Sequence, residues 1–402
     1  MRARKLISAA GMAAGLAMGL AGSPAWGQQT LVDEAPPVIV NEAEALARID
    51  VVFVLDTTGS MSGLIEGAKA KIWAIANQIA TAEPRPEIRM GLVGYRDRGD
   101  DYVTKLTPLT DDLDAVYADL MRFEAGGGGD GPESVNQALH EAVHAIDWGG
   151  SDAGATLRLI YLVGDAPPHM DYEQDTPYAE TCKEAVGRGI IINAIQCGVW
   201  DETSRIWREV AAMSEGEYFA IEQSGGVAVI ETPFDEQIAE LNAQVRGTML
   251  DYGDATTLTA QMAKRQEAET IDADAAPAAA ADRARYLYSR SGEKSLYGEQ
   301  ELVSDVQVGR VKLEDVPEDQ LPESMRSMTP EERATHVAQL QEEREKLVEQ
   351  IRELDAKRAA YITDELAKRA AAGEKGDGFD AKVGESVRRQ AARVGIRLAP
   401  EG

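Results

Sequence analysis

The alternation of apolar and helix-like segments is the feature of this chain that most restricts its fold. Between residues 46 and 248, short runs rich in Val, Ile and Leu alternate with longer segments of helical periodicity. This pattern predicts an α/β domain with a doubly wound, mostly parallel sheet. We expect strands at 49–56, 88–95, 102–106, 156–164, 190–197 and 217–221, and helices at 62–80, 112–121, 132–146, 178–188, 203–213 and 234–246. The 102–106 strand has no crossover helix before it, so we expect it to be an antiparallel edge strand.

A group of oxygen-bearing side chains follows the first of these strands. Asp56, Thr58 and Ser60 lie where the strand 49–56 turns into the helix 62–80. In an open α/β sheet, the carboxyl ends of the strands are where ligands bind. Carboxylate and hydroxyl oxygens suit Mg²⁺, Mn²⁺ or Ca²⁺ better than zinc. The alternative is that Asp56 ends a strand and the two hydroxyls only cap a helix.

The segment 56–60 resembles the D-x-[ST]-x-S signature of the von Willebrand factor A domain, whose metal-ion-dependent adhesion site (MIDAS) binds a divalent cation. The order of strands and helices is similar to that of this Rossmann-like fold over about 200 residues. The resemblance implies metal ligands on three loops, namely Asp56, Thr58 and Ser60, then Asp130 with Glu133 as the alternative, and finally Asp165. The second loop, residues 123–133, contains no threonine, which the family often has there.

The resemblance also implies a function. In the family, an open metal position captures an acidic group of a protein partner. We therefore expect an exported, non-enzymatic adhesion or scaffold protein that depends on Mg²⁺, or on Mn²⁺ or Ca²⁺. The formal net charge of −28 disfavours nucleic acid and anionic membranes as partners, because both would repel the chain.

A competing motif lies in the predicted helix 132–146. His140-Glu141-Ala142-Val143-His144 matches H-E-x-x-H, the pattern of zinc metallohydrolases. The apolar residues of that helix lie on a different face, so both histidines are expected to point toward solvent. No H-x-x-G-x-x-H extension follows, so the motif itself supplies no third zinc ligand. A more distant acid such as Glu173 is the alternative third ligand. The zinc hydrolase is therefore the alternative hypothesis.

The N-terminus predicts export to the periplasm or the medium. Three basic residues precede the uncharged segment 6–22, and Ala25-Trp26-Gly27 provides small residues for cleavage, so residues 1–27 are expected to be a signal peptide and 28–45 a flexible lead-in. No later segment is apolar enough to cross a membrane. The only two cysteines, Cys182 and Cys197, are either bridged or two separate buried thiols.

The second half of the chain carries less information. We expect an irregular, linker-like region at 249–330, because 272–281 is an Ala-rich, low-complexity segment. A helical region at 331–402 follows, and such regions resemble those found after von Willebrand A domains in exported bacterial proteins. Thr329 with Glu332 three residues later predicts a capping box at the start of its long helix, which runs to about Ala372. This helix carries an apolar stripe at seven-residue spacing: Leu340, Leu347, Leu354 and Tyr361. Arg344 and Arg358 at the companion positions disfavour a dimeric coiled coil. We expect a monomer in which this helix packs against 285–325 or against the final helix, 379–394.

Overall fold

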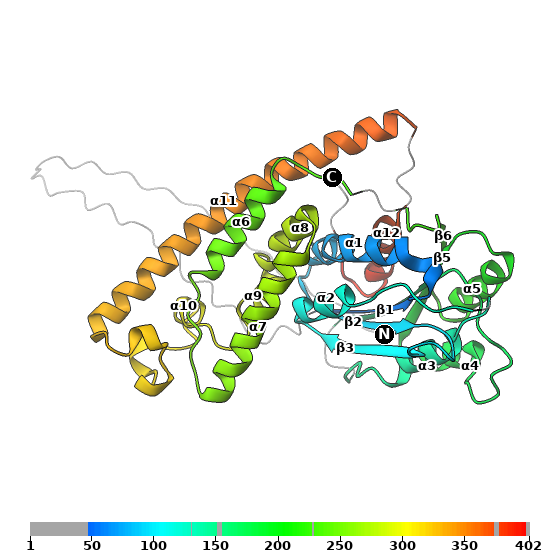
Figure 1. The fold of residues 1–402 in the computed structure, drawn as a ribbon, viewed down its shortest axis with the longest axis horizontal. Helices are drawn as coiled ribbons and strands as arrows, with labels where there is room; N and C mark the ends of the chain where they lie inside the picture. The colour runs from blue at the N-terminus through cyan, green and yellow to red at the C-terminus, as the bar shows by residue number, and fades with distance from the viewer. Residues whose placement is uncertain (1–46, 130, 151–154, 227–228, 374–377, 399–402) are drawn as a thin grey trace, which may run out of the picture. The chain divides into compact units, whose positions relative to one another are not determined.

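The predicted strands pair in one six-stranded sheet (Figure 1). In this computed structural model they are β1 (Ala47–Asp56), β2 (Pro86–Tyr95), β3 (Thr104–Thr110), β4 (Thr156–Gly164), β5 (Ile190–Cys197) and β6 (Tyr218–Ile221). Their order is β3-β2-β1-β4-β5-β6, and every neighbouring pair is parallel except β2 and β3. The predicted fold class is confirmed, and so is the antiparallel edge strand.

The structure describes residues 47–129, 131–150, 155–226, 229–373 and 378–398. The predicted signal peptide and lead-in lie outside these ranges, and both stay predictions. Within these ranges, no helix combines the length and the apolar character that a membrane span requires.

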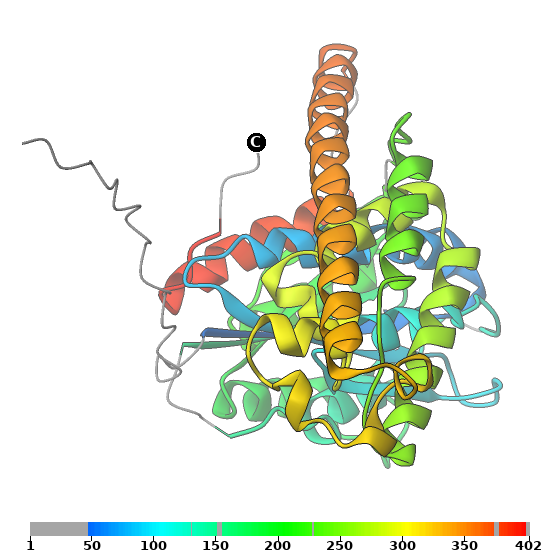
Figure 2. The ribbon, with the colours of Figure 1, turned by 90° about the vertical axis from the view of Figure 1, so that its left-hand side faces the viewer.

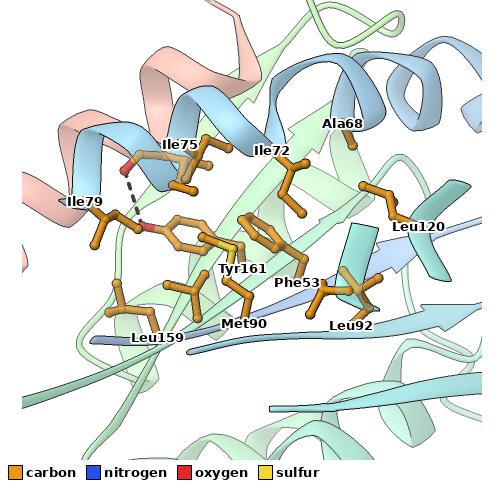
Figure 3. Packing of buried hydrophobic residues seen from close by; sticks show 14 of the residues in the cluster. Phe53, Ala68, Ile72, Ile75, Ile79, Met90, Leu92, Leu120, Leu159 and Tyr161 are labelled. Atoms are coloured by element: carbon orange, nitrogen blue, oxygen red, sulfur yellow. Dashed lines mark hydrogen bonds between the residues drawn. The ribbon is translucent and has the colours of Figure 1, made fainter. Parts of the chain in front are cut away.

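Helices cover both faces of the sheet. The residues of β1 alternate between two cores: Phe53 packs with α1 (Ser62–Ala80) and α2 (Leu113–Met121), as Figure 3 shows, whereas Val54 packs with the helices of the opposite face. Those helices are α3 (Val135–His144), α4 (Tyr178–Gly187) and α5 (Asp201–Met213). A strand that is buried on both sides explains the continuous apolar run from which the central strand was predicted.

The last helix of the chain, α12 (Phe379–Arg393), also packs on the sheet. Phe379 and other apolar residues of α12 join the core that α1 forms with the sheet. The Tyr161 hydroxyl on β4 and the Ser386 hydroxyl lie 2.6 Å apart, within hydrogen-bond distance. The side chains of Asn193 on β5 and Gln390 exchange two hydrogen bonds. The chain end therefore completes a layer of the α/β fold.

The low-complexity segment is helical, so the expectation of a linker there is wrong. Residues 255–274 form α7 and residues 277–287 form α8, with Asp254 capping the first and Pro277 beginning the second. Ala278 to Ala281 are buried, and α8 packs against α1 and α6 (Asp235–Arg246). Alanine has the highest helix propensity, and its small side chain lets neighbouring helices approach closely. The remaining short elements are α9 (Glu293–Tyr297), α10 (Leu302–Gln307) and 3₁₀ turns at Gly59–Met61, Arg290–Gly292, Leu313–Asp315, Glu318–Gln320 and Glu323–Met325.

The long helix α11 (Pro330–Ala371) packs within the chain, as expected. Its first turn has the predicted capping box between Thr329 and Glu332. The buried residues Leu347 and Leu354 contact α6 and α8, which lie along α11 in Figures 1 and 2. The N-terminal part of α11 packs on α10, inside the expected 285–325 region, but α12 is not its partner. The sequence pattern assigned α6 to the α/β domain. Because α6 packs mainly against α8 and α11, it belongs instead to the helical part of the chain, which comprises α6 to α11.

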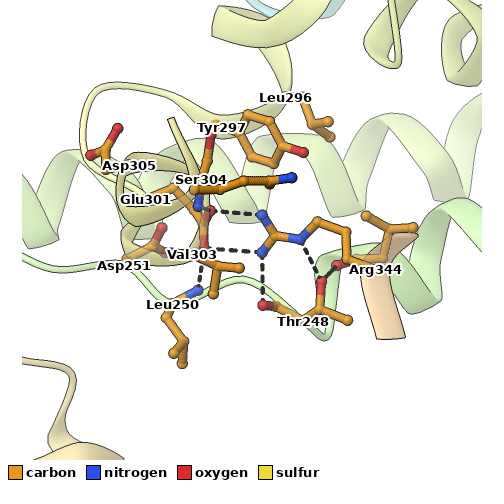
Figure 4. A network of polar contacts seen from close by, with 12 residues as sticks. Thr248, Leu250, Asp251, Leu296, Tyr297, Glu301, Val303, Ser304, Asp305 and Arg344 are labelled. Carbon is orange, nitrogen blue, oxygen red and sulfur yellow. Dashed lines mark hydrogen bonds and ion pairs between the residues drawn. The ribbon is translucent and has the colours of Figure 1, made fainter. Parts of the chain in front are cut away.

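The two arginines on the buried side of α11 are both paired. The Arg344 guanidinium donates to both carboxylate oxygens of Glu301, at 2.8 and 3.1 Å, and also to Thr248 (Figure 4). Arg358 donates to Asp235 at 2.7 Å and to Asp282 at 2.6 Å. Each buried arginine therefore has a carboxylate partner inside the same chain. These are the two residues that were expected to disfavour a dimeric coiled coil.

Candidate metal centre

The carboxyl ends of β1 and β4 bring the first and third predicted metal loops together. The two strands are in register up to Leu55 and Val163, so Asp56 and Gly164 are neighbours. A Cβ atom on Gly164 would lie 2.8 Å from Asp56 Cβ and 2.5 Å from the Tyr95 hydroxyl. Only glycine at position 164 leaves room for the Asp56 side chain at this point.

The first loop gathers its three predicted residues. Asp56 is fully buried, and its Oδ1 accepts hydrogen bonds from the Thr58 backbone N–H at 2.8 Å and from Thr58 Oγ1 at 2.6 Å. Thr58 Oγ1 and Ser60 Oγ lie 3.3 Å apart, and Ser60 is exposed. The other carboxylate oxygen, Asp56 Oδ2, is buried with no hydrogen-bond partner in the described part of the chain. The first loop therefore offers a series of oxygen donors, which runs from the buried Asp56 Oδ2 through Thr58 Oγ1 to the exposed Ser60.

The third-loop residue, Asp165, is held against the first loop by a glutamine that sequence reasoning missed. Gln223 follows β6, and its Nε2 donates to Asp165 Oδ2 at 2.6 Å and to the Ser60 carbonyl at 3.4 Å. Nothing in the sequence near Gln223 resembles a motif, because its role depends on where β6 ends relative to β4.

The second loop reaches the centre through Glu133. Asp130, the preferred candidate, lies outside the described residues, so its assignment stays a prediction. Glu133 is 3 % exposed, and its backbone N–H donates to the Pro167 carbonyl of the third loop at 2.9 Å. A Cβ atom on Gly128 would lie 3.4 Å from both Glu133 Oε1 and Thr58 Cβ. Glu133 Oε2 is buried without a hydrogen-bond partner among the described residues, so Glu133 is available as an oxygen ligand.

Two residues of the loop after β2 brace the first and second loops. Arg96 donates to the Thr57 carbonyl at 3.1 Å and to the Glu124 carbonyl at 2.7 Å. The Asp100 carboxylate accepts from the backbone N–H of Gly128, at 3.0 Å from Oδ2. Gly128 has a φ of +77°, which favours glycine. Sequence reasoning assigned no role to Arg96 or Asp100, because neither belongs to the predicted loops.

Burial of several carboxylates raises their pKa values. Desolvation, with a smaller contribution from the neighbouring Asp165, raises the pKa of Asp56 to about 7. Desolvation and then the charges of Asp56, Asp97, Asp100 and Asp165 raise the pKa of Glu133 to about 9. Negative charge at this sheet edge is thus costly until a cation compensates it. The donor set of carboxylates and hydroxyls, with two unpartnered carboxylate oxygens, fits a hard divalent cation.

The histidine motif lies on α3, and the expectation that both histidines point toward solvent is confirmed for His144 only. His140 is partly buried and His144 is exposed. Glu141 accepts a hydrogen bond from Gln137 at 2.9 Å. The carboxylate that approaches the two histidines belongs to Glu184 of α4 rather than to Glu173.

The cysteines are two separate buried thiols, which decides between the two alternatives. Cys182 packs in the core on the α3 side of the sheet, whereas Cys197 packs in the core on the α1 side. Burial raises the pKa of the Cys182 thiol to about 12, so it is unreactive at neutral pH.

Residues 50–232 match the family model of the von Willebrand factor A domain. This match agrees with the resemblance seen at the metal motif and covers less than half of the chain. The match ends before α6, in agreement with the packing of that helix against the helical part.

The chain is similar to two curated proteins. It is 27 % identical to alpha-protein kinase vwkA of Dictyostelium discoideum over 125 residues, which are 30 % of this chain and 19 % of the kinase. It is 23 % identical to the putative ariadne-like RING finger protein R811 of Acanthamoeba polyphaga mimivirus over 150 residues, which are 37 % of this chain and 14 % of that protein. The chain therefore matches less than a fifth of the length of either relative.

Among solved structures, the chain is similar to proximal thread matrix protein 1 from the mussel byssus, determined with a zinc-occupied MIDAS motif. The identity is 13 %, the match covers 44 % of this chain and 42 % of that chain, and the TM-score is 0.35.

Proposed function

We propose that this chain is an exported, non-enzymatic protein that binds a partner through a divalent cation at the carboxyl edge of its sheet. Asp56, Thr58 and Ser60 would hold the cation, with Asp165 and an acid of the second loop completing the site. That acid is either Glu133 or Asp130. The cation is Mg²⁺, with Mn²⁺ or Ca²⁺ as alternatives, because every donor is an oxygen.

The observation that carries the proposal is the pair of buried carboxylate oxygens without hydrogen-bond partners in the described chain, Asp56 Oδ2 and Glu133 Oε2. Buried charges are normally paired or bound to metals, because an isolated buried carboxylate loses its hydration without compensation. The exposed Ser60 hydroxyl places the outer side of the site next to solvent. An acidic side chain of a partner could then complete the coordination, which gives the adhesion or scaffold role.

The loop after β5 supports a protein as the partner. Val199 is 92 % exposed and Trp200 is 42 % exposed. The Trp200 ring lies against Gly131 of the second metal loop, and Gln223, which holds Asp165, packs against Gly198. Exposed aromatic side chains are typical anchors of protein interfaces, and here one lies beside the proposed cation site.

Calorimetric titration of the purified chain with Mg²⁺ and Mn²⁺ tests the proposal. Asp56→Ala and Ser60→Ala should abolish cation binding while the circular dichroism spectrum stays unchanged. Asp364→Ala, which removes an exposed acid from α11, is the matched control and should bind like the wild type. Unchanged affinity in both site variants would refute the assignment.

Partner capture tests the second half of the proposal. The immobilised chain should retain a protein partner in Mg²⁺ and release it in EDTA, and Ser60→Ala should retain none. Trp200→Ala should weaken retention without changing the Mg²⁺ affinity. Retention that survives EDTA would show that the partner does not need the cation.

A further inference from the structure

A second group of metal-ligating side chains lies on the opposite layer of the fold, between α3 and α4. His140 and His144 occupy successive turns of α3, and Glu184 extends from α4. One donor atom from each residue lies within 4.8 Å of the other two. The two imidazole rings have their centroids 4.5 Å apart, and His144 Nε2 lies 2.7 Å from Glu184 Oε2.

We propose that His140, His144 and Glu184 form a zinc site that fastens α4 to α3. Two imidazoles and one carboxylate are ligands that zinc accepts, and water would fill the fourth position. The site is chemically distinct from the sheet edge, where the donors of the proposed cation site are all oxygens. Mg²⁺ and Ca²⁺ have little preference for imidazole, so the two sites would select different ions.

The observed distances are close to those of a zinc site. With bonds of about 2.0–2.1 Å, two donors on a tetrahedral zinc ion lie about 3.4 Å apart. The His144–Glu184 contact would open slightly from 2.7 Å, and the widest separation would close from 4.8 Å at most. His144 and Glu184 are exposed, so rotations of their side chains meet little resistance.

The state of His140 supports the proposal independently. Its Nδ1 atom is buried, and among the described residues it has no hydrogen-bond partner. The ring therefore keeps unused binding capacity next to a second imidazole and a carboxylate. A metal bond to Nδ1 would use this capacity, which no protein group in the described part of the chain does.

The arrangement favours a structural role over hydrolysis. In H-E-x-x-H hydrolases the glutamate acts as the general base on the zinc-bound water. Here Glu141 is partly buried and hydrogen-bonded to Gln137 of the same helix. The zinc would instead join two helices that pack side by side in the same core.

Titration of the full chain with ZnCl₂ alone tests the site. The chain carries Asp56→Ala in this experiment, so that the proposed cation site at the sheet edge does not contribute to zinc binding. One zinc ion should bind per chain. His140→Ala, His144→Ala and Glu184→Gln should each weaken binding at least about tenfold, since even an outer-shell partner of a metal ligand contributes that much. His336→Ala is the matched control, because this histidine lies on α11, and it should leave the affinity unchanged.

Thermal unfolding then separates a fastening site from simple ion capture. At 100 times its dissociation constant, zinc should favour the folded state about 100-fold and raise Tm, and the rise should disappear in His144→Ala. Zinc affinity that is indifferent to the histidines would overturn the site. If zinc affinity falls in the histidine variants but not in Glu184→Gln, the ion does not join the two helices. The same conclusion follows if zinc leaves Tm unchanged. Peptidase activity that Glu141→Gln abolishes would overturn the structural role.

Discussion

At the scale of single residues, the proposed metal centre combines burial with negative charge. The pKa values of Asp56 and Glu133, about 7 and about 9, are both above their ordinary values because of desolvation. The folded, metal-free chain therefore holds protons that the unfolded chain has released. The stabilisation that these bound protons give the folded chain is complete below about pH 4. It is lost as the pH rises through these raised pKa values.

Cation binding should show the opposite pH dependence, because the cation competes with those protons. We expect Mg²⁺ affinity to be about tenfold weaker at pH 6 than at pH 8 from the protonation of Asp56 alone, since pH 6 lies one unit below its pKa. Calorimetry at pH 6, 8 and 9 measures this. In Glu133→Gln the further gain between pH 8 and 9 should be absent. An affinity that is constant over this range would contradict the proposed ligands.

Gly164 controls the position of Asp56 by leaving space. Gly164→Ala would put a methyl group 2.5 Å from the Tyr95 hydroxyl and 2.8 Å from Asp56 Cβ, inside a packed core. We expect a loss of about 1–3 kcal/mol of stability and a weaker Mg²⁺ affinity, measured by urea unfolding and calorimetry. Gly187→Ala at the end of α4, where a Cβ meets nothing within 4 Å, is the control and should neither destabilise the chain nor weaken Mg²⁺ binding. Equal behaviour of the two variants would show that the close packing at Gly164 is unimportant.

At the scale of elements, the helical part is joined by buried ion pairs as well as by apolar contacts. Arg344 of α11 and Glu301 are 3 % and 1 % exposed, and their pairing connects the long helix to the segment before α10 (Figure 4). A buried pair contributes little compared with an apolar pair, but loss of one partner leaves the other charge buried alone.

Arg344→Ala should therefore destabilise the chain by about 3–5 kcal/mol. The double variant Arg344→Met with Glu301→Gln should recover part of that loss, because no charge is left unpaired. The amide oxygen can still accept from the backbone N–H groups of Leu250 and Val303. Urea unfolding of both variants measures the difference. Arg352→Ala, at an exposed position of the same helix, is the control and should cost less than about 1 kcal/mol. A double variant as unstable as the single one would mean that packing, rather than charge, dominates at this position.

At the scale of the whole molecule, the helical part is an insertion within the α/β fold. The chain leaves the sheet after β6, forms α6 to α11, and returns as α12 to pack beside α1. Residues 45–402 accordingly form one compact unit. In the apolar stripe of α11, Leu347 and Leu354 are covered by α6 and α8, and Leu340 packs in the cluster that includes α10. Tyr361 is 39 % exposed, contrary to the expectation, so the stripe is covered within the chain except at this residue.

Light scattering of the full chain should therefore give a monomer, and Leu347→Glu should change stability rather than mass. Leu347 is 8 % exposed, so we expect a loss of about 2–5 kcal/mol with the molar mass unchanged. Leu366→Glu, at a residue of α11 that is 48 % exposed, is the control and should be nearly neutral. A wild-type dimer that Leu347→Glu dissociates would instead make α11 an oligomerisation element.

The sequence by itself determined the elements and the class of the fold, because both depend on local periodicity. The parallel strands, the helix α1, the capping box of α11 and the buried side of that helix were predicted from apolar spacing and cap residues alone. The segment Asp56–Ser60 pointed to a cation because its donors are close in the chain. The Ala-rich segment was misjudged, since composition does not show whether alanines are solvated or packed.

Only the tertiary structure decided which distant segments meet. Gln223 reaches Asp165, Arg96 joins two metal loops, and Glu184 approaches the histidines of α3 across long separations in the chain. The cysteines stay apart because the sheet lies between their two cores. The partners of α11 and the return of α12 to the sheet likewise have no local signal, because an apolar face specifies that it will be buried but not what will cover it.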